Sequence, residues 1–561
     1  MTAPATIAPV FENLPGLVDV GVMGPGGMPL AHTTRDSFET VVEMLRERGF
    51  AHLEFLTAQE RSGEEPGVEM LYGFTRRADL TRVVLAVPLA EDDLEIETLS
   101  WLWPGAAVLE REVFDLFGVA FEGHPALKRI VLRDDFEGHP LRKSFELVEG
   151  GVTAEQVAKA LESHGVAPTS LGADGGRQAY FDPFEHLAGG DPALKSQRMV
   201  INIGPQHPST HGVLHVYLAI DGEQVVGAEP TQGYLHRCIE KLCETRTYKA
   251  MPAMLDRCDY VSAFHAELAY SLAMEELLGI ESTPRADYLR VLMGELVRIT
   301  SHHTWFAAAG LDTGALTPFL FAFIDRELIL DFFEEVTGGR MMFNYIRPGG
   351  VKEDMPEGAA DKIRGFLDTF THRMDECEAL LTGNEIFRLR TRGIGFLDPA
   401  EVEPWCITGP VARASGIDID LRRDEPYAAY DRMKINVPLA YSGDTYDRYT
   451  VRVAEMREAG RLALEALNAL EGIEGPHINP DVPRVIKPEA GTAAYGRVES
   501  PRGELGVLVI SDGTDKPWRL KVRSPAMSNL HCAPVILQNT KVGDVVAVLG
   551  SVDIVMGEID R

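Results

Sequence analysis

The sequence predicts an α+β protein of two domains, a small α/β domain followed by a helix-bundle domain with flanking β-structure. At 561 residues the chain is too long for one ordinary hydrophobic core. Residues 1–148 mix helical and strand-like patterns, whereas residues 199–561 hold several long stretches with apolar residues three and four apart. Residues 149–198 are rich in Gly, Asp and Pro and have little periodicity, which predicts a linker between the domains.

Composition excludes several classes of function. Hydrophobic residues make up 45% of the chain and charged residues 25%, as in globular proteins. The net charge of −31 argues against a nucleic-acid partner, since such proteins carry a basic stripe. Six irregularly spaced cysteines do not indicate a disulfide framework. The N-terminus lacks a basic, apolar leader and no window approaches the ~18 apolar residues of a spanning helix, so we expect an intracellular protein that reaches a membrane only through partners.

The first domain contains one clear helical and one clear strand-like segment. Residues 37–50, "SFETVVEMLRERGF", have helical periodicity, and residues 81–89, "TRVVLAVPL", are typical of a strand. The tetrapeptide "EGHP" occurs twice and raises the question of paired metal ligands at His124 and His139. Because Gly-His-Pro is turn chemistry and no cysteine lies nearby, we interpret both copies as turns.

The second domain begins with strands and continues as helices. Residues 199–204 and 212–230 predict strands, with Asp221-Gly222 as a hairpin turn. Apolar periodicity predicts helices that pack as a bundle; they cover residues 260–280, 285–310, 327–339, 359–383 and 449–472. Residues 503–525 return to a strand-like pattern.

The stretch "GPQHPSTHG", residues 204–212, is the most unusual in the chain. His207 and His211 are four apart, the spacing that places two zinc-binding imidazoles on one helical face. Pro208 between them and glycines at both ends argue against a helix. The residues alone leave open a metal site, a turn, or a rigid loop that presents a histidine.

Standard catalytic motifs are missing: the chain has no phosphate-binding P-loop, no H-E-x-x-H and no strand-to-helix G-x-G-x-x-G. We interpret Cys238 and Cys243 as core thiols on a predicted helix. His211, Tyr260 and Asp312 remain as candidates, although the residues by themselves favour ordinary structural hydrogen bonds for all three. Together they suit quinone reduction, in which histidine and tyrosine donate protons to the carbonyl oxygens and a carboxylate orients the histidine.

Several long motifs in the same order resemble the D subunit of respiratory complex I, and residues 110–147 resemble its C subunit. The D-like motifs are "INIGPQHPSTHGVLHVYLAIDGE", "GYLHRCIEKLCETRTY", "DRCDYVSAFHAELAYSLAMEELLGI", "GLDTGALTPFLFAF", "RPGGVKEDMPEG" and "GSVDIVMGEIDR". The resemblance covers nearly the whole chain and implies a fused C/D subunit of a proton-translocating NADH:quinone oxidoreductase. It also implies that the second domain is similar to the [NiFe]-hydrogenase large subunit.

The resemblance implies roles for individual residues. His211 would lie at a hairpin tip that lines the quinone-headgroup pocket, Tyr260 would lie opposite, and Asp312 would pair with the histidine. Arg237 matches an arginine close to a [4Fe–4S] cluster held by a neighbouring subunit, so this chain itself is expected to bind no metal or cofactor. The expected partners are the cluster-bearing B-type and I-type subunits and the membrane H-type subunit, on the cytoplasmic side of the bacterial inner membrane.

Three alternatives compete with this interpretation. A hydrogenase needs two Cys-x-x-Cys pairs, but Cys258 stands alone and the terminal motif has no cysteine. A complex-I-like assembly with another electron donor, or a hydrogenase-derived scaffold without direct chemistry, stays open.

Met342 occupies a place where many relatives carry a histidine, and a thioether cannot titrate. That leaves room for a low-potential quinone, and the sequence does not distinguish ubiquinone from menaquinone.

Overall fold

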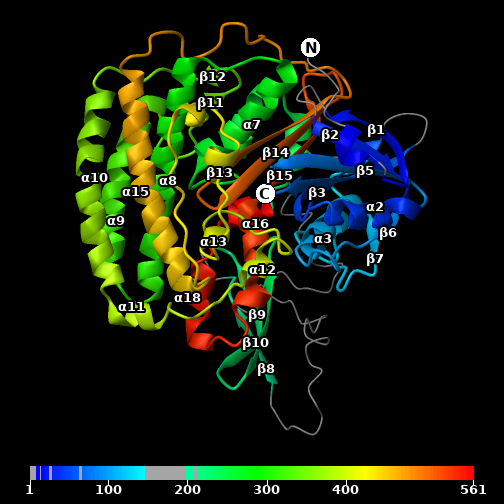
Figure 1. The fold of residues 1–561 in the computed structure, drawn as a ribbon, viewed down its shortest axis with the longest axis horizontal. Coiled ribbons are helices and arrows are strands. Elements are labelled where there is room, and N and C mark those ends of the chain that lie inside the picture. The colour runs from blue at the N-terminus through cyan, green and yellow to red at the C-terminus, as the bar shows by residue number, and fades with distance from the viewer. Residues whose placement is uncertain (1–7, 13, 24–27, 62–65, 146–197, 206–211) are drawn as a thin grey trace, which may run out of the picture.

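The computed structural model describes residues 8–12, 14–23, 28–61, 66–145, 198–205 and 212–561. Two parts of unequal size lie side by side (Figure 1). The β-rich part up to residue 145 is called the N-terminal half below, and the larger, mainly helical part from residue 198 to 561 is called the C-terminal half. The predicted linker, except its last residue, lies outside the described residues, and so do His207 and His211. The mixed α+β class is confirmed.

The N-terminal half is built on a five-stranded sheet of order β1-β2-β5-β4-β3, in which only β2 and β5 pair in parallel. Helix α2 covers the sheet with Phe38, Val41, Val42 and Leu45, at the helical spacing seen in the sequence. The elements are α1 (Ala8–Phe11), β1 (Leu17–Met23), β2 (Met28–Thr33), α2 (Arg35–Glu47), β3 (His52–Arg61), β4 (Gly67–Arg76), β5 (Thr81–Ala90), β6 (Glu95–Glu97), α3 (Ala106–Phe117) and β7 (Ala120–Glu122).

The C-terminal half has two three-stranded antiparallel sheets. One has the order β10-β9-β8 and the other β13-β14-β15. Their strands are β8 (Arg198–Ile203), β9 (His215–Asp221), β10 (Gln224–Thr231), β13 (Ala493–Ser500), β14 (Gly503–Ser511) and β15 (Pro517–Arg523); β11 (Ile346–Arg347) and β12 (Gly350–Val351) form a short ribbon. The predicted strands and the turn at Gly222, which has φ 62°, are confirmed.

The long helices of this half form an upright bundle at one side of the molecule (Figure 1). The longer ones are α7 (Ala263–Leu278), α8 (Pro284–Asp312), α9 (Leu316–Thr337), α10 (Ala359–Thr382) and α15 (Thr445–Leu470). The shorter ones are α5 (Ile239–Thr245), α6 (Met251–Leu255), α11 (Glu385–Leu389), α12 (Pro399–Val402), α13 (Gly409–Arg413), α14 (Leu421–Asp424), α16 (Pro525–Leu530), α17 (Ala533–Ile536), α18 (Val545–Gly550) and α19 (Met556–Asp560). None of the described helices is long and apolar enough to cross a membrane.

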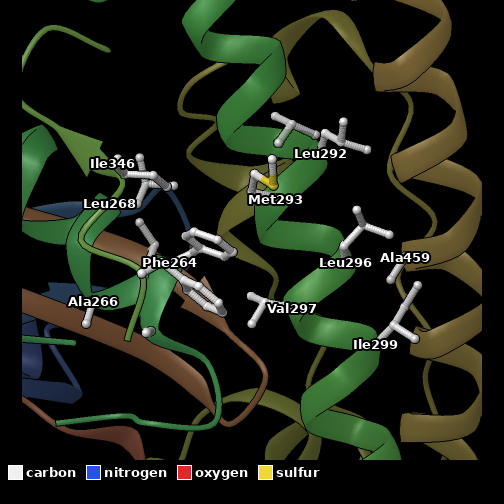
Figure 2. Close-up of a cluster of buried hydrophobic side chains, with 14 of the residues drawn as sticks. Phe264, Ala266, Leu268, Leu292, Met293, Leu296, Val297, Ile299, Ile346 and Ala459 are labelled. Carbon is white, nitrogen blue, oxygen red and sulfur yellow. The ribbon is translucent and has the colours of Figure 1, made fainter. Parts of the chain in front are cut away.

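Helix α8 is the central element of the bundle core. It starts at Pro284 after Thr283, whose side chain accepts a hydrogen bond from the Ala286 N–H, as expected of an N-cap. Figure 2 shows side chains of α7, α8 and α15 meeting there, with Phe264 facing Val297. The Phe264 ring also stacks on Phe343 with a centroid distance of 4.0 Å. Burial of this apolar surface is the main stabilising contribution of the bundle.

Two predictions needed correction. Helix α9 begins at Leu316, eleven residues before the predicted start, because its first half is apolar on several sides and shows no single stripe; Leu316, Leu320 and Ile324 are exposed there. Cys238 does not lie on a helix: it precedes α5 with φ 54°, in the left-handed region, and is half-buried. Cys243 is a buried core thiol, as predicted.

The two halves meet along a charged, buried layer between β3 and β15. Arg519 Nε donates to the Ala58 carbonyl (3.1 Å) and Trp518 Nε1 to the Glu60 carbonyl (3.0 Å). Ion pairs join Arg497 to Glu54 (3.1 Å) and Lys521 to Glu112 (2.5 Å). The N-terminal half therefore neutralises charges that β13 and β15 would otherwise bury without partners.

Candidate functional site

The last turn of the described chain, α19, lies beside two of the predicted site residues, Arg237 and Tyr260. Its residues are buried, and the Asp560 carboxylate accepts hydrogen bonds from the N–H groups of Gly233 (2.9 Å) and Leu235 (2.7 Å). The Arg561 carbonyl accepts hydrogen bonds from the N–H groups of Arg237 and Ile239. This turn thus fixes the segment that carries Arg237.

Tyr260 lies close to Gly557 of this turn, and Gly212 lies close to the adjacent Met556. A Cβ placed on Gly557 would lie 2.8 Å from Tyr260 Cε1, so the tyrosine ring rests against a backbone where only glycine fits. A Cβ on Gly212 would lie 3.5 Å from Met556 Cγ. Gly212 directly follows His211, which lies outside the described residues. Gly212 and Tyr260 therefore lie against the adjacent residues Met556 and Gly557.

The electrostatic surroundings of Tyr260 keep its hydroxyl protonated. Burial raises the pKa of Tyr260, and the adjacent Asp259 carboxylate adds to this, while Arg502 and Arg237 act in the opposite direction. Arg502 forms a buried ion pair with Asp259, with 2.8 Å between Nη1 and Oδ2. A tyrosine in this setting can donate its hydroxyl hydrogen to an acceptor at neutral pH.

A second acidic group lies in the same cluster. Glu558 is fully buried, and neither of its carboxylate oxygens has a hydrogen-bond donor among the described residues. Burial, together with Asp259, raises the pKa of Glu558 to about 8 despite the opposing effect of Arg502. An unpaired buried carboxyl holds its proton to a higher pH than an exposed one.

Arg237 and Cys258 flank Tyr260. The Arg237 guanidinium donates through Nη2 to the Arg257 carbonyl and is close enough to Cys258 and Tyr260 to oppose the rise in their pKa values. Burial nevertheless raises the pKa of Cys258 to about 12, so its thiol stays protonated. In the described part of the chain, no group of three or more His, Cys, Asp or Glu side chains is arranged to hold a metal ion.

Asp312 is the last residue of α8, and this end of the helix is tied to the C-terminal region. Trp305 Nε1 donates to the Gly550 carbonyl (2.8 Å), and Arg390 bridges from the Asp312 carbonyl (3.4 Å) to the Asp544 carboxylate (3.1 Å). The expected pairing of Asp312 with His211 involves a residue outside the described ranges, so it stays a prediction.

Four other histidines considered in the sequence, and Met342, have structural surroundings. His124 and His139 hydrogen-bond the carbonyls of Ala107 and Asp115, as turn residues would. The buried His302 contacts the Glu455 carboxylate at 3.1 Å, and the buried His303 contacts Met374 Sδ at 3.4 Å. Met342 has φ 57° and is partly exposed.

Sequence reasoning missed three charged residues of this site: Asp259, Arg502 and Glu558. Asp259 and Glu558 stand inside the D-like motifs, next to residues of interest, and that proximity was the available signal. Arg502 lies 243 positions from its partner Asp259, and nothing in the local pattern marks it.

Comparison with known proteins identifies both halves. The family described as "Respiratory-chain NADH dehydrogenase, 30 Kd subunit" matches residues 31–150, and the "49 Kd subunit" family matches residues 312–561. The chain is 36% identical to the C/D 2 subunit of NADH-quinone oxidoreductase from Aquifex aeolicus over 95% of both chains. It is 44% identical to the D 2 subunit of NADH-quinone oxidoreductase from Symbiobacterium thermophilum, covering 65% of this chain and 99% of the relative. The chain therefore belongs to the family of fused C/D subunits of NADH-quinone oxidoreductase, the respiratory complex I.

Proposed function

We propose that the C-terminal half forms the quinone-headgroup site of complex I. There, electrons from a [4Fe–4S] cluster on a neighbouring subunit would reduce quinone, in a reaction coupled to proton translocation. The observation that carries this proposal is that Gly212, the residue after His211 in the sequence, and Tyr260 approach the adjacent residues Met556 and Gly557.

Tyr260 and His211 are the hydrogen-bond and proton donors in this proposal, and Asp312 orients His211. The raised pKa of Tyr260, caused first by burial, supports the role of its hydroxyl as a donor. When Tyr260 gives its proton to a carbonyl oxygen of the quinone, its phenolate carries a negative charge. Arg502 and Arg237 stand beside Tyr260 to stabilise that charge.

Arg237 would face the cluster-bearing subunit. Its backbone is fixed by the Arg561 carbonyl, and its guanidinium would favour the reduced, more negative cluster through Coulomb attraction. The cluster supplies electrons one at a time when its subunit is in place. The partners would be the B-type and I-type cluster subunits and the membrane H-type subunit, on the cytoplasmic side of the inner membrane.

The same half would retain the architecture of a [NiFe]-hydrogenase large subunit without its metal. Cys258 lies on the loop before α7 with its thiol protonated, and residues 545–561 contain no cysteine. A scaffold without chemistry is the alternative, and the neutral Tyr260 beside two cationic side chains favours the quinone site over it.

The test compares two activities of the assembled complex in the same membranes: quinone reduction and reduction of an artificial acceptor upstream of the quinone. Tyr260→Phe removes one buried hydrogen bond, worth about 1–3 kcal/mol, so quinone turnover should fall roughly tenfold or more. His211→Ala should be at least as damaging and Asp312→Asn milder, while artificial-acceptor activity persists in all three. Equal loss of both activities would make these residues structural. Unchanged quinone turnover in Tyr260→Phe and His211→Ala would contradict the proposal.

A further inference from the structure

Cys238 and His236 form a thiol–imidazole pair that the proposed quinone chemistry does not use. Cys238 Sγ lies 3.3 Å from His236 Nε2. On the other side of the ring, His236 Nδ1 lies 2.6 Å from the Asp560 carbonyl, which can only accept, so Nδ1 carries a hydrogen and Nε2 faces the sulfur. A nucleophile, a base and a group that orients the base are thus in line.

This pair opens into a cavity at the boundary of the two halves. The cavity is lined by Cys238, His236 and Lys241 on one side and by Leu116, Val131 and Leu141 of the N-terminal half on the other. The left-handed backbone of Cys238, with φ 54°, is uncommon for a residue with a side chain and turns this position out of α5.

The other five cysteines provide an internal contrast. All six lie in described stretches, and Cys238 is half-buried whereas the others are buried. Burial raises the pKa of Cys258, Cys377, Cys406 and Cys532 to about 12, and it raises the pKa of Cys243 well above its usual value. Burial alone would lower the pKa of His236, but the contact with Cys238 and the carbonyl and carboxylate of Asp560 raise it. Cys238 is the one cysteine in the described stretches that is not fully buried, and its sulfur has an imidazole nitrogen within contact distance.

We propose that Cys238 is a modification site that reacts with small disulfides, with His236 as its base. The Cys238 thiol gives its proton to His236 Nε2, and the thiolate attacks one sulfur of the disulfide. The S–S bond of the reagent breaks, a new bond forms between Cys238 Sγ and the attacked sulfur, and the leaving thiolate takes the proton from His236. The reagent is the oxidant, so the products are a mixed disulfide and one small thiol.

The experiment uses the full chain and 2,2′-dithiodipyridine, an uncharged disulfide whose released thiopyridone is followed by absorbance, with the modified cysteine located by peptide mass. Cys238 should react at least about tenfold faster than any other cysteine of the folded chain. Cys238→Ser should remove this fast phase. Reaction of Cys238 no faster than the five buried cysteines would overturn the proposal.

A second set of variants tests the base. His236→Asn keeps an N–H for the Asp560 carbonyl and removes the basic nitrogen, so the fast phase should slow at least about tenfold. The matched control is His372→Asn, because the side chain of His372 on α10 is 80% exposed; it should change nothing. If His236→Asn unfolds the region, the buried cysteines become reactive as well, and His236→Gln is then measured with the same expectation. An unchanged rate in a folded His236 variant contradicts the role of the imidazole.

Discussion

The core of the helix bundle and the layer between the two halves are both closed to solvent, yet their side chains differ. Between α7, α8 and α15 the buried groups are apolar, with Phe264 and Leu296 fully covered (Figure 2). Between β3 and β15 the buried groups include Arg497, Arg519 and Lys521, each paired with a glutamate. The first region gains stability from burial itself, whereas the second must match every charge.

The difference bears on the proposed site. The charged layer continues to the C-terminal turn, because Glu112 of the N-terminal half pairs with both Lys521 and Arg561 (2.5 and 2.9 Å). The turn that contacts Tyr260 and Gly212 is thus held partly by the other half of the chain. The apolar core stabilises the bundle, and the charged layer positions the turn at the site.

The largest effect is expected in the apolar core. Phe264→Ala removes a fully buried ring that stacks on Phe343 at 4.0 Å. Loss of transfer free energy and the cavity left behind should lower the free energy of unfolding by about 3–5 kcal/mol. Urea unfolding of the chain measures this. A cost below about 1 kcal/mol would show that the core is not tightly packed there.

The stability of the charged layer should depend on whether each charged side chain keeps a partner, and not on side-chain volume. Glu112→Ala leaves Lys521 and Arg561 sharing Glu240, and we expect a loss of about 3 kcal/mol in unfolding free energy. The double variant Glu112→Met, Lys521→Met removes both charges of one pair and should cost clearly less than Glu112→Ala. If the double variant is the less stable of the two, the layer is held by shape and the contrast with the bundle fails.

A change of pH acts on both regions through buried histidines. Burial is the main cause that lowers the pKa values of His52, in the charged layer, and of His303, in the bundle, to about 3. Below pH 6.5 the unfolded chain gains protons that these folded imidazoles do not, so stability falls as the pH falls from 6.5 toward 3. At pH 5 each should cost about 2 kcal/mol.

His52→Gln and His303→Gln should each reduce this pH dependence, and His372→Gln, at an exposed position, should not. Urea midpoints at pH 7 and pH 5 make the comparison. Identical pH dependence in all three variants would show that neither buried histidine is held neutral in the folded chain.

Much of the bundle could be predicted from the sequence, because apolar residues three and four apart mark a buried helical face. The charged layer could not be predicted from the sequence. In β15, Arg519, Lys521 and Arg523 alternate with Leu520 and Val522, which predicts a strand with one face in solvent. The structure covers that face with the N-terminal half instead, since carboxylates from distant positions complete the pairs.

The candidate site also contains some residues that could be predicted from the sequence and others that could not. Tyr260 and Arg237 were predicted through resemblance to a family, and the structure places them near each other. Arg502 and Glu558 were not found, because their effect on the site depends on contacts between residues far apart in the chain. A periodic pattern carries no information about such contacts.

The smallest effect is expected from cutting the chain between the halves. Residues 1–150 and 190–561, co-expressed as separate polypeptides, should purify together and assemble into active complex, because the ion pairs of the charged layer need no covalent connection. Recovery of the two pieces apart would show that the removed segment carries structure that the complex requires.

The central claim is that Gly212 and Tyr260 meet on the C-terminal turn and that the quinone site forms there. Gly557→Ala tests this claim most directly. The added methyl would lie 2.8 Å from Tyr260 Cε1 and 2.9 Å from the Cys258 carbonyl, so it must displace the ring. The control is Gly365→Ala on α10, where a methyl meets nothing within 4 Å. The measurement is the ratio of quinone reduction to artificial-acceptor reduction in assembled complex. The ratio should fall at least about tenfold in Gly557→Ala and stay unchanged in Gly365→Ala; equal ratios in the two variants would contradict the account.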